Sequence, residues 1–117
     1  MLMADATVLL VEDHETLGAY ITLALVDQGC KVLGPATSVS DALSILGEGK
    51  PDAAVLDYQL SDGETSEAVL AILEERNVPV CVISGSLREQ LPPDFFKYPF
   101  LQKPFGPQDL YEVLERL

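Results

Sequence analysis

The sequence predicts an α/β domain built on a parallel β-sheet. Strand-like and helix-like patterns alternate from one end of the 117 residues to the other. Two of the strand patterns, Thr7–Val11 and Ala53–Asp57, are continuous apolar runs, which are typical of strands buried on both faces of a sheet. Such alternation favours parallel strands joined by right-handed helical crossovers, which bring the carboxyl ends of all strands to one side.

The first half of the chain contains three strands and two helices. A helix is expected over residues 15–28, because Gly29 stands where a helix-ending glycine is common and apolar residues recur at helical spacing at Leu17, Ile21, Ala24 and Leu25. Residues 31–33 are expected to form a shorter second strand. Either Ser38 or Ser40 caps the next helix, whose apolar positions are Ala42, Leu43, Ile45 and Leu46. That helix stops at Gly47 or Gly49, before the Ala53–Asp57 strand.

The second half continues the alternation with one irregular stretch. A helix is expected over about 64–76, with apolar positions Ala68, Val69, Ile72 and Leu73, followed by a strand over 78–83. The last strand is Phe100–Gln102, and the last helix covers 107–117, starting at a proline that suits a first helical turn. Segment 86–99 holds three prolines and no long amphipathic pattern. The helix between the fourth and fifth strands should therefore be short, broken or absent.

Length and composition restrict the class of protein. A chain of 117 residues fits one domain, residues 1–117, and 48% hydrophobic residues can supply its core. The net charge of −12 argues against nucleic acid and anionic membranes as partners, because phosphate contacts need lysine and arginine. No apolar run is long enough to span a membrane and no signal peptide is present, which predicts a cytoplasmic protein. Cys30 and Cys81 are expected to be buried free thiols.

Four strand patterns end on residues that can handle a phosphoryl group. Glu12-Asp13 follows the first strand, Asp57 ends the third, Ser84 ends the fourth and Lys103-Pro104 follows the fifth. Because ligands of open parallel sheets bind at the carboxyl ends of the strands, these residues should share one edge. Any one acid alone is more simply a solvated strand end. Three acids at two strand ends, with a lysine at another, favour a site.

The residue types of this set indicate its chemistry. Carboxylates held together repel one another, so they need a cation or shared protons. Oxygen ligands without a histidine cluster favour Mg²⁺, and Mn²⁺ should substitute. Asp57 can attack phosphorus as a nucleophile and form an aspartyl phosphate. The Lys103 ammonium and the Ser84 hydroxyl can then bind phosphoryl oxygens, since phosphoryl transfer depends mainly on positioning and electrostatics.

The chain resembles a receiver domain of the two-component response-regulator family over essentially its whole length. The motifs that carry the resemblance are Val11-Glu12-Asp13, Leu56-Asp57 with Asp62-Gly63 downstream, Ile83-Ser84-Gly85 and Lys103-Pro104-Phe105. The resemblance implies a flavodoxin-like, doubly wound, five-stranded parallel sheet of order 2-1-3-4-5. It also implies phosphorelay signalling: a histidine kinase or a histidine phosphotransfer protein donates the phosphoryl group in a Mg²⁺-dependent reaction.

The family assigns a role to each matching residue. Asp57 takes the place of the phosphoacceptor. Asp13, Asp57 and the Gln59 carbonyl take the metal-ligand places, and Glu12 acts on the metal through a bound water. Lys103 takes the place of the family's lysine. Ser84 and Phe100 take the places of the switch hydroxyl and the switch aromatic, which move together when the site is phosphorylated and change the contacts with a downstream protein target or in a homodimer.

The chain departs from the family pattern at several points. The usual proline in the loop after the phosphoacceptor is missing, and Gln59-Leu60-Ser61 stands before Asp62-Gly63. Ser84 replaces the commoner threonine, Gly85 replaces alanine, and Phe100 lacks a tyrosine hydroxyl. Segment 86–99 lies on the usual signalling face, so the surface that contacts partners should be atypical.

Two other functions fit the sequence less well. A receiver-like binding module that acts without phosphorylation would keep the fold, but it would not need the complete set of site residues. A phosphatase with an aspartyl-phosphate intermediate usually has a second acid two residues after the nucleophile, where this chain has Gln59. The leading interpretation is therefore a receiver that catalyses only its own phosphorylation and dephosphorylation, either as a stand-alone regulator or as part of a larger protein.

Overall fold

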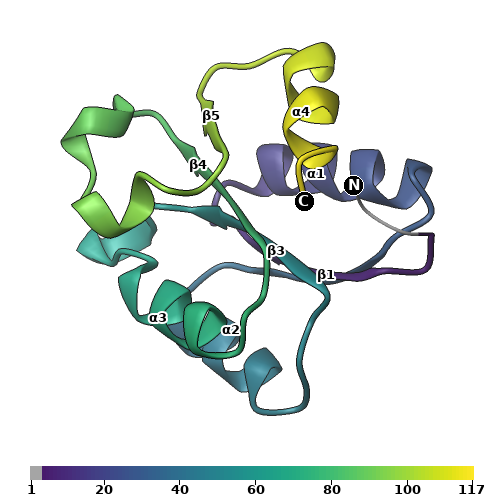
Figure 1. Cartoon of the computed structure of the whole chain (residues 1–117), viewed down its shortest axis with the longest axis horizontal. Coiled ribbons are helices and arrows are strands. Elements are labelled where there is room, and N and C mark those ends of the chain that lie inside the picture. The colour runs from purple at the N-terminus through teal and green to yellow at the C-terminus, as the bar shows by residue number, and fades with distance from the viewer. Residues whose placement is uncertain (1–3) are drawn as a thin grey trace.

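A computed structural model describes residues 4–117 and contains one five-stranded sheet (Figure 1). The strands are β1 (Thr7–Val11), β2 (Lys31–Ala36), β3 (Ala53–Asp57), β4 (Val80–Ser84) and β5 (Phe100–Gln102). All neighbouring strands pair in parallel, in the order β2-β1-β3-β4-β5. The expected fold and strand order are confirmed. Residues 1–3 lie outside the described range. They belong to the N-terminal stretch in which the sequence predicts no signal peptide.

Helices cover both faces of the sheet. The helices are α1 (Glu15–Asp27), α2 (Val39–Leu46), α3 (Glu67–Glu75) and α4 (Pro107–Leu114). In Figure 1, α1 and α4 lie on one side of the strands, and α2 and α3 lie on the other. The apolar core is divided in the same way, because α1 and α4 pack on one face of the central strands and α2 and α3 pack on the opposite face. The central strands are therefore buried on both sides, as their continuous apolar sequences predict.

Caps and turns explain where the helices begin. Ser38, rather than Ser40, caps α2, and its hydroxyl accepts a hydrogen bond from the Asp41 N–H. The first helix begins after His14, whose Nδ1 accepts from the Leu17 N–H. His14 is exposed to solvent.

The third helix begins later than the sequence pattern suggests. Residues 61–63 form a 3₁₀ turn in which Asp62 and Gly63 have left-handed φ angles of 60° and 75°. That turn delays the start of α3 from about residue 64 to Glu67. The buried positions of the helix then include Leu70, whereas Ala68 faces solvent. The expectation that Ala68 lies on the apolar face was wrong.

Segment 86–99 contains two short 3₁₀ turns, Arg88–Gln90 and Pro93–Phe95, in place of a regular helix. Leu91 and Phe95 are buried and join the part of the core under α2 and α3. The Phe95 ring packs edge-to-face against Tyr58, with ring centroids 5.0 Å apart. The prolines prevent a helix, but the segment still covers the sheet through two apolar side chains.

The remaining general expectations can be compared with the described residues. Cys30 and Cys81 are both buried and free, as expected. Within residues 4–117, none of the helices is long and apolar enough to cross a membrane.

The buried Phe95 yields the first testable prediction. Phe95→Ala should lower the free energy of unfolding by about 3–5 kcal/mol, because it leaves a cavity beneath segment 86–99 and removes the contact with Tyr58. Urea denaturation followed by circular dichroism measures the change. Phe96→Ala is the matched control, since the neighbouring ring is 40% exposed and its loss should cost far less. Equal losses in the two variants would contradict this account of the segment.

Candidate functional site

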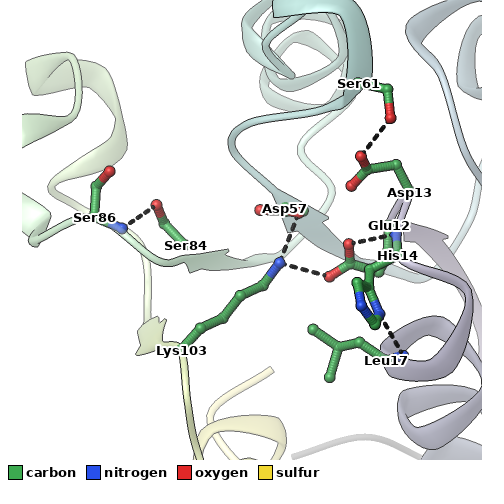
Figure 2. A network of polar contacts seen from close by, with 9 residues as sticks. All are labelled: Glu12, Asp13, His14, Leu17, Asp57, Ser61, Ser84, Ser86 and Lys103. Carbon is green, nitrogen blue, oxygen red and sulfur yellow. Dashed lines mark hydrogen bonds and ion pairs between the residues drawn. The ribbon is translucent and has the colours of Figure 1, made fainter.

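Three carboxylates gather at the carboxyl ends of two adjacent strands. Asp57 is the last residue of β3, and Glu12 and Asp13 directly follow β1. The parallel register pairs Val11 with Leu56, so the two strand ends lie side by side. Oxygen atoms from the three acids all lie within 4.8 Å of one another. Asp57 and Glu12 are buried, and Asp13 is partly exposed. Figure 2 shows the three side chains together with their polar contacts.

Lys103 provides the positive charge of this cluster. Its Nζ donates a hydrogen bond to Asp57 Oδ2 at 2.8 Å and forms an ion pair with Glu12 Oε1 at 3.0 Å. The Lys103 N–H bonds to the Ser84 carbonyl at 2.8 Å, which continues the pairing of β5 with β4 and fixes where the side chain starts. The Lys103–Pro104 peptide bond, directly after this lysine, is cis.

The ionisation of the site reflects burial and charge. Burial raises the pKa of Asp57 to about 7, and the neighbouring Glu12 adds to this rise while Lys103 opposes it. Burial alone would lower the pKa of Lys103, but its contacts with Asp57 and Glu12 raise it overall. Burial alone would raise the pKa of Asp13. The hydrogen bond from Ser61 and other contacts outweigh this effect and hold the pKa below the ordinary value of an aspartate. The site thus favours a cationic lysine and an ionised Asp13.

The other expected site residues lie farther from this cluster or have different partners. Ser84 is buried, and its Oγ accepts a hydrogen bond from the Ser86 N–H at 3.0 Å, on the side away from Asp57 in Figure 2. Gln59 is exposed and pairs with Thr65 in an isolated antiparallel bridge. Phe100 is partly buried on β5 and lines a cavity of about 300 Å³ beside α4.

Ser61 is a site residue that the sequence reasoning did not identify. Its hydroxyl donates a hydrogen bond to Asp13 Oδ2 at 2.6 Å, across the edge of the sheet. The only sequence signal was indirect, since Ser61 lies in the loop that lacks the expected proline.

The donor set fits a hard divalent cation. Every candidate ligand in the cluster of Glu12, Asp13 and Asp57 is a carboxylate oxygen, which is the donor type that Mg²⁺ prefers. The partly exposed Asp13 leaves one side of the cluster open to solvent, and Mg²⁺ usually keeps several waters.

The sheet order and the acid–lysine edge define a flavodoxin-like α/β domain with an acidic site at its strand ends. The family model described as "Response regulator receiver domain" matches residues 8–115, and the chain belongs to this family. Receiver domains act in two-component signalling and bind Mg²⁺ at an acidic pocket, which corresponds here to the three carboxylates.

Individual relatives agree with this assignment. The chain is 31% identical over 102 residues to the KDP operon transcriptional regulatory protein KdpE of Escherichia coli, covering 85% of this chain and 45% of KdpE. It is 35% identical over 80 residues to the DNA-binding transcriptional activator DevR/DosR of Mycobacterium tuberculosis, covering 68% of this chain and 37% of that protein. The chain therefore spans less than half the length of these curated relatives.

Solved structures show the same fold. The solution structure of SdrG from Sphingomonas melonis matches with a TM-score of 0.84 and 29% identity, and the similarity covers 97% of each chain. The crystal structure of the response regulator PhyR from Brucella abortus matches with a TM-score of 0.82 and 26% identity, over 97% of this chain and 47% of PhyR.

The raised pKa of Asp57 yields a prediction about stability. A carboxyl whose folded pKa lies above its unfolded value favours the fold at low pH, and this contribution is lost as the pH rises through the folded pKa. Asp57→Asn cannot ionise. In metal-free buffer its stability relative to the wild type should therefore increase by about 2 kcal/mol between pH 5 and pH 8.

Urea denaturation in EDTA at both pH values measures this difference. Asp62→Asn is the control, because Asp62 is exposed in the same loop and its left-handed backbone suits asparagine. A stability difference for Asp57→Asn that is the same at both pH values would contradict a raised pKa for Asp57.

Proposed function

We propose that this domain accepts a phosphoryl group on Asp57 from a phosphohistidine of a histidine kinase or of a histidine phosphotransfer protein. The observation that carries the proposal is the setting of the Asp57 carboxylate. It is buried at the end of β3, lies beside two further carboxylates and is bonded to Lys103 Nζ at 2.8 Å. Family membership supports the same conclusion.

The transfer is a displacement at phosphorus. An Asp57 carboxylate oxygen forms the new O–P bond while the N–P bond of the donor phosphohistidine breaks. The electron pair of that bond returns to the imidazole nitrogen, which takes up a proton. Lys103 already contacts the attacking carboxylate, so its ammonium is placed to bind an oxygen of the phosphoryl group that arrives there.

Glu12, Asp13, Asp57 and the Gln59 carbonyl would hold Mg²⁺, with Glu12 acting from the outer coordination shell. When bound, the cation would neutralise part of the charge on the transferring phosphoryl group. The oxygen-only donor set also suits Mn²⁺ as a substitute. Asp13 stays ionised at neutral pH, since its pKa is held below the ordinary value of an aspartate, and an ionised carboxylate can bind the cation.

Phosphorylation would switch the surface through Ser84 and Phe100. The Ser84 hydroxyl hydrogen is available to a phosphoryl oxygen, but reaching it requires the side chain to turn away from the Ser86 N–H. This movement would leave space toward which the partly buried Phe100 could shift. The added charge of about −1.5 to −2 supplies the driving force.

The consequence would be a change in contacts with a downstream protein or with a second copy of the domain. Residues 1–117 would act as one receiver domain that turns over only its own aspartyl phosphate. The strongly negative charge argues against direct binding of nucleic acid by this domain. Its two free thiols are compatible with a cytoplasmic setting.

Chemical phosphorylation tests the proposal directly. The wild type treated with acetyl phosphate or phosphoramidate and Mg²⁺ should gain the mass of one phosphoryl group, because Asp57 is the nucleophile. Asp57→Asn should gain none, and chelation of Mg²⁺ should reduce the yield in the wild type. Intact-protein mass spectrometry measures all three results.

Asp62→Asn is the matched control and should be phosphorylated like the wild type, since Asp62 is an exposed acid outside the cluster. If the wild type gained no mass, or if Asp57→Asn gained as much, the proposed function would fail. A receiver-like module that binds partners without phosphorylation would then be the better description.

The switch also makes a distinct prediction. Ser84→Ala should still bind beryllofluoride with Mg²⁺, because Asp57 and Lys103 remain, but the amide signals of residues 86–99 should shift less than in the wild type. The reason is that Ser84 Oγ links the site to the Ser86 N–H. Two-dimensional NMR measures the shifts, with Ser84→Thr as the variant that keeps the hydroxyl. Wild-type shifts in Ser84→Ala would contradict the role of Ser84.

A further inference from the structure

We propose that Ser61 is a positioning residue that holds the Asp13 carboxylate in the orientation the cation site requires. The inference rests on the proposed function, because it concerns the same Mg²⁺ site. It adds a residue to that site from the loop between β3 and α3. It also adds a physical link between that loop and the end of β1.

The contact has the geometry of a strong hydrogen bond. Ser61 Oγ donates to Asp13 Oδ2 at 2.6 Å, within the range expected for a hydroxyl bonded to an ionised carboxylate. The two residues are 48 positions apart in the sequence, so the bond joins separate parts of the fold. In Figure 2, Oδ2 points to Ser61 and the second Asp13 oxygen turns to the side on which Asp57 lies.

The turn that presents Ser61 is itself well fixed. Leu60 is buried, and its N–H bonds to the Glu64 carbonyl at 2.8 Å. The Glu64 N–H returns to the Ser61 carbonyl at 3.3 Å, which closes the turn across the left-handed Asp62 and Gly63. Ser61 therefore starts from an anchored backbone, although its side chain is exposed.

The bond matters because the three carboxylates are held in different ways. Lys103 makes ion pairs with Glu12 and Asp57, both of which are buried. Asp13 is partly exposed, and Ser61 restrains it from the opposite side of the cluster. A hydrogen bond to one oxygen leaves the other available to a cation and reduces the rotamer freedom that binding would otherwise have to remove.

The residue in this loop matters, because the resemblance to receiver domains leads one to expect a proline there. The loop lacks the proline that the family usually has there, and proline has neither a hydroxyl nor an N–H to donate. Here a serine hydroxyl in that loop contacts a candidate metal ligand directly.

Mg²⁺ titration of four proteins tests the inference. Isothermal titration calorimetry on the wild type, Ser61→Ala, Ser61→Thr and Thr65→Val gives the four dissociation constants. Ser61→Ala should bind Mg²⁺ about tenfold more weakly, as is typical when a group that orients a metal ligand is lost. Ser61→Thr keeps the hydroxyl and should restore the wild-type affinity. Thr65→Val is the control: it removes a hydroxyl from the same loop, but this hydroxyl contacts Glu67 and not Asp13. Thr65→Val should therefore bind Mg²⁺ like the wild type.

The outcomes separate the inference from the function on which it rests. If the wild type bound Mg²⁺ and Ser61→Ala bound it equally well, Ser61 would have no positioning role and the proposed function would stand. If the wild type bound no Mg²⁺, the cation site and the inference would both fall. Urea denaturation in EDTA completes the test. If Ser61 had only a structural role, Ser61→Ala would lower the stability of the metal-free protein and leave the Mg²⁺ affinity unchanged.

Discussion

The contacts of Lys103 with Asp57 and Glu12 are the interaction on which this site depends. Two buried carboxylates a few ångströms apart would repel one another strongly in surroundings of low dielectric constant. The lysine ammonium lies 2.8 Å from one and 3.0 Å from the other and compensates part of their charge, although the pKa of Asp57 is still raised to about 7. The fold can therefore keep an acidic cluster at its strand ends in the absence of a divalent cation. Binding such a cation would let the lysine turn to an incoming anionic group.

The parallel sheet makes that compensation possible. Glu12 leaves β1, Asp57 ends β3 and Lys103 leaves β5, so the three charges come from separate parts of the chain. The order β2-β1-β3-β4-β5 places β1 beside β3, and β4 separates β3 from β5. The long lysine side chain is needed to cross that extra strand. The shorter side chain of an aspartate is sufficient at the end of β3. These different distances account for an aspartate at the end of β3 and a lysine after β5.

The sequence was sufficient where the pattern is regular and insufficient where it is not. Apolar runs ending in Asp57 and before Glu12 identify buried strands, and parallel topology then brings their ends together, so the acid cluster could be predicted. The late start of α3 could not, because it depends on the left-handed turn at Asp62 and Gly63. Leu91 and Phe95 lie among prolines and close to Leu87 and Phe96, which are apolar but exposed, so residue type alone does not mark the buried pair. Ser61 was missed because a single loop serine carries no pattern.

The irregular segment between β4 and β5 limits where a signal could travel. Its two ends behave differently: residues 87–90 are exposed, whereas Leu91 and Phe95 are anchored in the core beneath α2 and α3. Ser84 is bonded to the Ser86 N–H at the exposed end. A turn of the Ser84 side chain would therefore release the chain at Ser86, and the first buried anchor beyond it is Leu91. Within segment 86–99 the conformational change should be concentrated before Leu91, because moving the rest of the segment would expose Leu91 and Phe95 to water.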